Sequence, residues 1–295
     1  MKVGFIGLGI MGRPMAKNMI QAGMDLMVSD LKEEAVADLV AAGAETGTYE
    51  RIGAECGIIF IIVPNGDIVK SILFGKGGVA ETVKTGCIVC DMSSVTPVES
   101  KECYDKLKAQ GVGFVDAPVS GGESGAIAGT LAIMAGGDNE CFEALKEYFD
   151  VLGSSALLIG GSGSGSVTKL ANQLIVNNTI AVVSEAFVLA VKAGADPEKV
   201  YQAIRGGLAG SAVMDAKVPM IVDRNFKPGG PIRINHKDIK NVINTAHAID
   251  APIPYTAQLY EILQTMKIHG HMEDDHGGIV QYFEKLADVE VKKVN

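Results

Sequence analysis

The sequence predicts an α/β domain with a doubly wound parallel sheet, followed by an all-helical C-terminal domain. Up to about residue 163, short β-branched runs alternate with stretches of helical spacing. Alternating βαβ units build a right-handed parallel sheet with helices on both faces. Beyond residue 164 the strand pattern stops and helical spacing continues. We therefore expect one domain over residues 1–163 and a second over residues 164–295, with the functional site in the cleft between them.

Six segments of the first half have the composition of strands. Several are apolar at nearly every position, as expected for strands that are covered on both faces. Helical spacing fills the intervals, for example over residues 10–23 and 95–111, and ends at glycine. The predicted strands span residues 2–6, 25–30, 57–63, 87–92, 111–117 and 130–137.

The second half begins with one long apolar helix. Residues 166–195 continue the helical pattern for about 30 residues, and Gly194 is placed to end it. The next helix has Asp196 as its expected cap and Pro197 at its first position. Further helices are predicted over residues 237–250, 254–270 and 277–291.

Composition excludes several classes of function. With 295 residues, 47% of them hydrophobic, the chain can bury one large core or two medium ones. A net charge of −9 argues against nucleic acid as a partner, and an anionic substrate would need local cations. The sequence shows neither an uninterrupted apolar run of membrane-spanning length nor a signal-peptide pattern, so we expect a cytoplasmic protein without a membrane partner.

The cysteines favour a reduced protein. There are five of them, an odd number, and they are scattered along the chain. Cys87 and Cys90 form a C-x-x-C pattern, but inside an apolar strand, where positions three apart point to opposite faces. Core cysteines are therefore expected rather than a redox or zinc pair.

A glycine-rich turn in the segment GFIGLGIMG, residues 4–12, predicts a dinucleotide site. Gly7 would allow the tight turn, Gly9 the approach of a pyrophosphate, and Gly12 the packing of the helix on the strand. The helix N-terminus then presents free N–H groups to the phosphates. Asp30 follows the second strand, where a carboxylate accepts ribose hydroxyls and repels a 2′-phosphate, so NAD is favoured over NADP.

Lys169 is the only charged residue between residues 161 and 184, near the expected start of the long helix. An unpaired buried charge costs several kcal/mol even after relaxation. A lysine that extends to solvent is one explanation, although a cation is mildly unfavourable at a helix N-terminus. The alternative is that the ammonium group meets an anion or takes part in chemistry.

Histidine and acidic residues gather in HGHMEDDH, residues 269–276. Six of these eight residues could ligate a metal, but their spacing is irregular and they interrupt two helical stretches. We favour a polar connecting loop over a metal site and expect no bound metal, although His276 could approach the mouth of the functional site.

Four segments together resemble the β-hydroxyacid dehydrogenase family, and they extend over the whole chain. They match in turn the cofactor signature, the substrate-binding signature, the catalytic-lysine segment and a downstream lysine segment of that family. The segments are GFIGLGIMGRPMAKNM (4–19), DAPVSGGESGAIAGTLAIMAGG (116–137), GSGSVTKLANQ (163–173) and INHKDIKN (234–241).

The resemblance implies hydride transfer between a nicotinamide and a short hydroxyacid or semialdehyde. The family's catalytic lysine corresponds to Lys169, which would act as general acid or base. Many members carry Asn four residues after this lysine, whereas this chain has Gln173 there and Asn172 before it, so either amide is a candidate to orient the substrate. The substrate carboxylate is expected at Ser120 and at the backbone of Gly121 and Gly122, a potential anion-binding nest.

The resemblance also implies further contacts of the cofactor. Lys237 is a candidate for both cofactor and substrate, although a Lys-Asp pair at a helix start is more commonly a solvated cap. The full set of expected cofactor-binding residues is Gly7, Leu8, Gly9, Ile10, Met11, Gly12, Asp30, Val63, Pro64, Asn65, Ser94 and Lys237.

Within the family, residues 204–217, IRGGLAGSAVMDAK, resemble the tartronate semialdehyde reductases. Ser211 and the glycines would leave hydrogen-bonding room for a small polar acid. A 3-hydroxyisobutyrate dehydrogenase and a glyoxylate or succinic semialdehyde reductase remain alternatives, as does a cofactor-binding module without turnover. The Ala- and Val-rich helix and the resemblance both suggest a homodimer or homotetramer.

Overall fold

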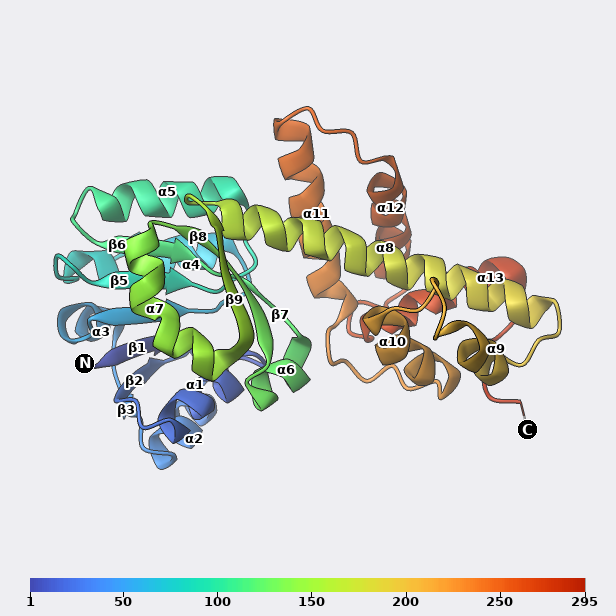
Figure 1. Ribbon diagram of the computed structural model, residues 1–295, viewed down its shortest axis with the longest axis horizontal. Helices are drawn as coiled ribbons and strands as arrows, with labels where there is room; N and C mark the ends of the chain where they lie inside the picture. The colour runs from blue at the N-terminus through green and yellow to red at the C-terminus, as the bar shows by residue number, and fades with distance from the viewer. Residues whose placement is uncertain (295) are drawn as a thin grey trace. The chain divides into compact units, whose positions relative to one another are not determined.

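The computed structural model describes residues 1–294 and contains two compact units, Met1–Lys169 and a second that begins at Leu170. Their division falls inside one helix, whereas the sequence predicts a boundary at the start of that helix. The first unit contains the sheet, and the second is helical (Figure 1). This arrangement confirms the predicted fold class.

The first unit is built on a mostly parallel sheet, which is nine-stranded over the residues that the structure describes. Its order is β3-β2-β1-β4-β5-β6-β8-β7, and β9 pairs with β8. The strands are β1 (Val3–Ile6), β2 (Leu26–Ser29), β3 (Glu45–Thr46), β4 (Ile58–Ile61), β5 (Ile88–Asp91), β6 (Gly113–Asp116), β7 (Val119–Ser120), β8 (Leu131–Gly137) and β9 (Gly153–Gly160).

The prediction of an entirely parallel sheet is wrong at one edge. The pairs from β3 through β6 are parallel, but β8 runs antiparallel to both β6 and β7. The chain reverses over the short α6, so no crossover helix separates β7 from β8. β3 and β7 have only two residues each, so their sequences carry no strand signal. The longer β9 was not predicted either; its positions alternate between exposed and half-buried from Ser155 to Gly160 but include no fully buried one.

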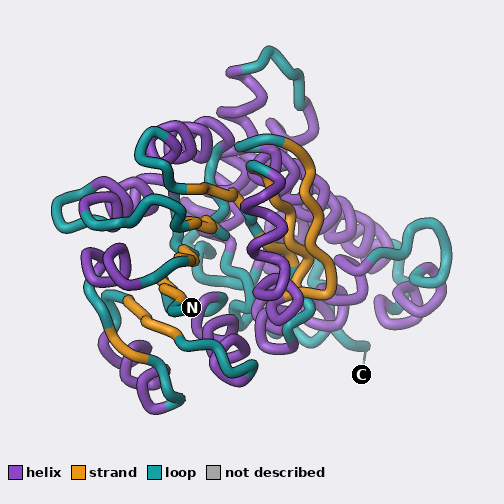
Figure 2. The backbone as a smooth tube through the Cα atoms, turned by 60° about the vertical axis from the view of Figure 1, so that its left-hand side comes forward, coloured by secondary structure: helices purple, strands orange, loops and turns teal. Residues whose placement is uncertain are grey.

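Helices cover both faces of the sheet, as Figure 2 shows for the orange strands between purple helices. Neighbouring residues of a strand enter different cores, since Phe5 lies in one buried cluster and Ile6 in the other. Cys90 and Cys87 divide in the same way, which confirms that they are core residues. The elements are α1 (Gly12–Gln21), α2 (Glu33–Ala41), α3 (Tyr49–Glu55), α4 (Gly66–Phe74), the 3₁₀ turn η1 (Val79–Glu81), α5 (Pro97–Lys108), α6 (Gly122–Ala128) and α7 (Asn139–Leu152).

The helical part begins with α8 (Ser164–Lys192), which has 29 residues and confirms the predicted long helix. Gly194 ends it with φ +87°, and Asp196 and Pro197 begin the next helix as predicted. The sequence missed α10, whose start is capped by Ser211. The remaining elements are α9 (Pro197–Ile204), α10 (Ala212–Val222), α11 (Ile232–Ala248), α12 (Pro254–Ile268), the 3₁₀ turn η2 (His276–Ile279) and α13 (Val280–Ala287).

Within residues 1–294, α8 is the one helix with the length and hydropathy that a membrane span needs, and 39% of its most apolar window is buried. Packing accounts for much of this composition. Leu170 and Ile180 belong to a core shared with α11 and α12, and Phe187 to a core shared with α10. Part of the apolar character of α8 therefore follows from its place between two cores of the helical unit, and other apolar residues of the helix stay exposed.

Candidate active site

The glycine loop has the three properties that the sequence predicts for it. Gly7 has φ +98°, and a Cβ there would collide with the carbonyl of Ile62. A Cβ on Gly12 would collide with the Gly7 carbonyl, so helix α1 packs directly on the turn. A Cβ on Gly9 would meet nothing within 4 Å. The loop thus combines tight internal packing with open space where a pyrophosphate would approach.

A cavity of about 290 Å³ adjoins this loop. Asp30 holds the loop from the end of β2, because its Oδ2 accepts a hydrogen bond from the Leu8 N–H at 2.5 Å and its Oδ1 one from Lys32 N–H at 2.8 Å. Each oxygen keeps a lone pair for a further donor. The cavity is lined by Leu8, Gly9, Ile10, Arg13, Pro14, Lys32, Glu34, Ala35 and Glu123. The loop, the cavity and the acid fit a nicotinamide dinucleotide.

The loops that follow β4 and β5 are joined by hydrogen bonds. The Val63 N–H donates to Ser93 Oγ, and the Ser93 N–H donates to Asp91 Oδ1, both at 2.9 Å. Burial raises the pKa of Asp91 to about 7. Asn65 caps α4 by accepting from the Ile68 N–H, which gives its side chain a structural role in addition to the predicted cofactor contact. Sequence reasoning missed Asp91 and Ser93, although both stand where a parallel strand ends.

The predicted carboxylate anchor lies at the end of β7. Ser120 is half-buried, and the next two residues both have left-handed backbone, with φ +141° at Gly121 and +64° at Gly122. Glycine takes such angles most readily, so the turn itself favours glycine at both positions. The turn brings consecutive backbone groups together at the start of α6, the geometry on which the predicted nest depends.

Lys169 lies in the second turn of α8, one turn later than the sequence predicts, because the helix begins at Ser164. The residue is buried, with 8% of its surface exposed. This burial argues against a lysine that simply extends along the surface to solvent. A buried lysine at this point of a long apolar helix is a candidate for a functional residue.

A chain of amide and ionic contacts connects α8 to α11 within the helical unit. Asn172 Nδ2 donates to Gln173 Oε1 at 2.9 Å, and Gln173 Nε2 donates to Asp238 Oδ2 at 2.6 Å. Lys237 Nζ lies 2.9 Å from the other oxygen of Asp238. The interpretation of Lys237 and Asp238 as a solvated cap is wrong, since α11 begins five residues before Lys237 and Asp238 is only 2% exposed.

The first unit places its predicted cofactor-binding residues just after the carboxyl ends of its parallel strands. Gly7–Gly12 follow β1, Asp30 follows β2, and Val63–Asn65 and Ser94 follow β4 and β5. In a parallel sheet, ligands bind beyond the carboxyl ends of the strands, where these segments lie. The helical unit separately joins Asn172, Gln173 and Lys237.

Comparison with known proteins identifies the chain. Residues 2–161 match the family model of the NAD binding domain of 6-phosphogluconate dehydrogenase. Residues 163–283 match the model of the NAD-binding domain of NADP-dependent 3-hydroxyisobutyrate dehydrogenase. The chain belongs to the β-hydroxyacid dehydrogenase family. It is an oxidoreductase that acts on CH–OH groups with a nicotinamide dinucleotide, so the alternative of a module without turnover falls away.

Individual relatives of this dehydrogenase cover nearly its whole length. The 2-hydroxy-3-oxopropionate reductase of Escherichia coli is 41% identical over 98% of this chain and 99% of its own. The 2-(hydroxymethyl)glutarate dehydrogenase of Eubacterium barkeri is 35% identical over 98% and 97%. The crystal structure of a 3-hydroxyisobutyrate dehydrogenase from Salmonella typhimurium superposes with a TM-score of 0.86 at 29% identity, covering 95% of this chain and 99% of that one.

The histidine- and acid-rich segment of the dehydrogenase is more ordered than a solvated loop. Asp275 is fully buried, with Lys217 Nζ 2.8 Å from its Oδ1 and the Gly229 and Gly230 N–H groups bonded to its Oδ2. Burial and the Lys217 charge lower the pKa of His276 to about 4, so it is neutral at pH 7. Among residues 1–294, no group of three or more His, Cys, Asp or Glu side chains is arranged to hold a metal.

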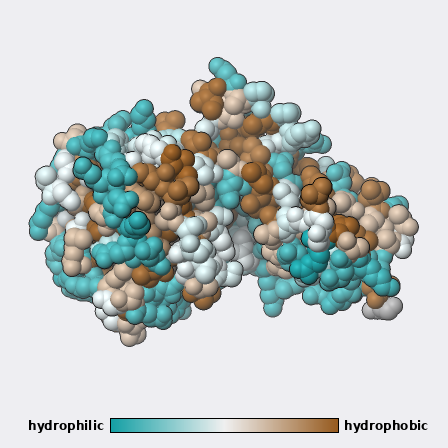
Figure 3. Space-filling model, in the orientation of Figure 1, coloured by the Kyte–Doolittle hydropathy of each residue, from teal (hydrophilic) through white to brown (hydrophobic). Residues whose placement is uncertain are grey.

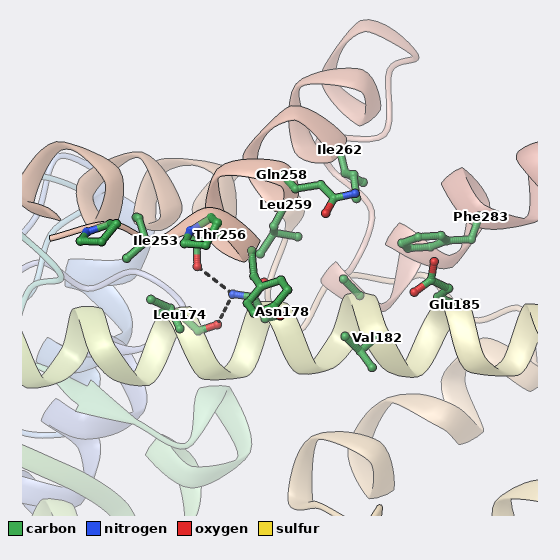
Figure 4. A pocket seen from close by; sticks show the side chains of 14 residues that line it. Leu174, Asn178, Val182, Glu185, Ile253, Thr256, Gln258, Leu259, Ile262 and Phe283 are labelled. Atoms are coloured by element: carbon green, nitrogen blue, oxygen red, sulfur yellow. Dashed lines mark hydrogen bonds between the residues drawn. The ribbon is translucent and has the colours of Figure 1, made fainter. Parts of the chain in front are cut away.

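The helical unit of the dehydrogenase also contains a cavity of about 700 Å³ between α8 and α12 (Figure 4). Asn178 spans its floor, where Nδ2 donates to Thr256 Oγ1 at 3.0 Å and to the Leu174 carbonyl at 2.8 Å. Its walls are mostly aliphatic, with Val182, Leu259 and Phe283 on view in Figure 4. Since this cavity contains none of the predicted site residues, it takes no part in the candidate active site.

Proposed function

We propose that the protein reduces tartronate semialdehyde (2-hydroxy-3-oxopropionate) to D-glycerate with NADH. The observation that carries this proposal is Lys169, a buried lysine on the helix that also bears Asn172 and Gln173. The substrate assignment is supported by the segment 204–217 and by the 41% identity to a 2-hydroxy-3-oxopropionate reductase over nearly the full length. Ser211 contributes through structure, since its hydroxyl caps α10 by accepting from the Met214 N–H.

The chemistry assigns a task to each element of the site. When bound, the nicotinamide supplies the hydride that reduces the aldehyde carbon. The Lys169 ammonium stabilises the developing alkoxide and gives it a proton, and the neutral amine would take that proton back in the oxidative direction. Asn172 or Gln173, on the same side of α8 one turn later, holds the substrate hydroxyl or carboxylate. Ser120, with the backbone of Gly121 and Gly122, binds the carboxylate.

Asp30 is the basis for proposing NAD as the cofactor. Two backbone N–H groups hold it at the end of the glycine loop, where a carboxylate can accept from the ribose hydroxyls and repel a 2′-phosphate. Arg13 lines the neighbouring cavity, but its guanidinium is engaged with Asp38 at 2.6 Å. Lys32 is the other cation of the lining, and we propose that the Asp30 carboxylate, which is bonded to the glycine loop itself, dominates at the ribose and favours NAD over NADP.

The proposed partners are a small anionic substrate and further copies of the same chain, in the cytoplasm, without nucleic acid or membrane. Ile175, Val182 and Leu189 recur every seven residues on α8 and are each more than 60% exposed. In the space-filling view, hydrophobic residues lie on the face of the helical unit that α8 crosses (Figure 3). Burying such a stripe against another copy would form a homodimer or homotetramer. Light scattering of the wild type and of Val182→Asp would test this, with dissociation expected for the variant.

The enzymatic test compares initial rates with NADH for tartronate semialdehyde, methylmalonate semialdehyde, succinic semialdehyde and glyoxylate. We expect tartronate semialdehyde to lead in kcat/KM by about tenfold, a difference of about 1.4 kcal/mol in transition-state binding. A different leading aldehyde would overturn the substrate assignment and leave the family intact. Lys169→Met should lower kcat by about a thousandfold or more with NADH affinity unchanged. Retained activity in that variant would remove Lys169 from the mechanism.

A further inference from the structure

Asp116 lies next to the start of α8, which carries Lys169, and just before the loop of Ser120. It ends β6, four residues before Ser120, and it is completely buried. Its neighbour in the sheet register is Asp91 of β5. Burying a carboxylate at the end of a strand costs free energy unless its oxygens accept hydrogen bonds. The partners of Asp116 therefore indicate its role.

Both oxygens of Asp116 bind the start of the helix that carries Lys169. Oδ1 accepts from the Gly163 N–H at 2.7 Å, and Oδ2 accepts from the Ser166 N–H at 2.8 Å. The first N–H groups of a helix have no partner within the helix, and a carboxylate there also interacts favourably with the helix dipole. Hydrogen bonds that N–H groups donate to a carboxylate are shorter and stronger than those donated to a neutral acceptor.

Close packing leaves the start of α8 little freedom. Ser100 Oγ on α5 and Ser166 Oγ are 2.8 Å apart, and both residues are 1% exposed. A Cβ on Gly165 would collide with the carbonyl oxygens of Met134 and Asp116. Gly165 and Ser166 are therefore explained by a helix start that packs closely against β6, β8 and α5.

We propose that Asp116 is a positioning residue for proton transfer by Lys169. Ser166, which it binds, precedes Lys169 by three residues, less than one helical turn, so a rigid helix start fixes the path of the lysine side chain. Asp116 also leads into the loop of Ser120. It therefore fixes the position of the helix that carries Lys169 relative to the proposed carboxylate anchor. This inference rests on the proposed role of Lys169. Asp116 itself exchanges no proton with the substrate.

The test is Asp116→Asn, which keeps the side-chain shape but turns one acceptor into a donor that faces a backbone N–H. We expect kcat per NADH-binding site to fall 10- to 100-fold, because small displacements of a catalytic group cost this much. The NADH dissociation constant and the KM of the semialdehyde should stay within threefold. The solvent deuterium isotope effect on kcat should rise, since transfer of the proton from Lys169 becomes slower than hydride transfer.

The matched control is Leu145→Ala on α7, which opens a cavity in the core of the same unit without touching α8. It should lose a similar amount of thermal stability and keep its wild-type kcat per binding site and isotope effect. If Asp116→Asn does not fold, the double variant Ser100→Ala, Ser166→Ala removes the second anchor of the helix start. It should lower kcat three- to tenfold with the same change in isotope effect.

The outcomes separate this inference from the proposed function. An active Lys169→Met variant would overturn the proposed mechanism and the role of Asp116 with it. The positioning role alone would be overturned if Lys169→Met is inactive while Asp116→Asn keeps a wild-type kcat. If Asp116→Asn does not fold, the same conclusion follows from a wild-type kcat in the double variant Ser100→Ala, Ser166→Ala. A loss of kcat with an unchanged isotope effect would also overturn it, since proton transfer would then be unaffected.

Discussion

Gln173 on α8 and Asp238 on α11 are joined by a 2.6 Å hydrogen bond between two nearly inaccessible side chains. Both amide atoms of Gln173 are engaged, since Oε1 accepts from Asn172 and Nε2 donates to Asp238. The acid has Lys237 at its other oxygen. Gln173, one helical turn after Lys169, is thus part of the contact between two helices of the same unit.

Replacing Gln173 with leucine should destabilise the helical unit by about 1–3 kcal/mol, because a buried carboxylate oxygen loses its donor. The substrate KM should rise as well, since Asp238 and Lys237 lose their fixed arrangement. Denaturation midpoints and steady-state kinetics with NADH would measure the two effects.

Asn178→Leu provides the matched control for that variant. It removes another amide of α8 from a bond between helices, the one to Thr256, but outside the candidate site. We expect a similar loss of stability with unchanged kcat and KM. Equal kinetic defects in both variants would mean that Gln173 acts only through stability.

Adding a methyl group to the glycine loop should have a different effect at Gly9 and at Gly12. Gly9→Ala meets no atom within 4 Å, so its stability should stay within about 0.5 kcal/mol of the wild type. The added methyl would stand where the pyrophosphate approaches, and the NADH dissociation constant should rise tenfold or more. Gly12→Ala collides with the Gly7 carbonyl and should be destabilised by about 1–3 kcal/mol. Fluorescence titration with NADH and thermal denaturation separate the two, and normal NADH binding in Gly9→Ala would contradict the assigned site.

The parallel strands and the long helix were predictable because their signals are local. Continuous apolar runs mark β1, β4 and β5, and Asp196 with Pro197 marks a helix start by chemistry alone. The antiparallel edge was not predictable, since β7 has two residues and its pairing depends on a distant strand. The burial of Asp116, Asp238 and Asp275 could not be predicted for a similar reason. A buried acid and a surface acid look alike in sequence, and only tertiary partners distinguish them.

Asp91 should make stability depend on pH. Burial raises its pKa from the ordinary value near 4 to about 7 in the folded state. Between these values the folded protein holds more protons than the unfolded chain, so stability falls as the pH rises from about 4 to 7 and the loss is complete above that. Asp91→Asn keeps an acceptor for the Ser93 N–H and removes this cost. Relative to the wild type, the variant should gain about 2–3 kcal/mol more stability at pH 8 than at pH 5.

Urea denaturation at pH 5, 6.5 and 8 would measure that difference. Asp150→Asn on the exposed side of α7 controls for the loss of one negative charge and should show no such trend. A pH dependence that is identical in the wild type and in Asp91→Asn would place the proton uptake on another group.

Cofactor preference should respond to Asp30. In Asp30→Asn the side-chain oxygen can still accept from the Leu8 N–H, so the loop stays in place, but the negative charge that opposes a 2′-phosphate is gone. We expect the ratio of kcat/KM for NADH to that for NADPH to fall at least tenfold, mainly through a lower KM for NADPH. Glu34→Gln removes a charge from the lining of the same cavity and serves as the control, with a change below threefold. If Glu34→Gln shifts the ratio as strongly, the discrimination arises from the summed charge of the cavity, and Asp30 loses its special role at the ribose.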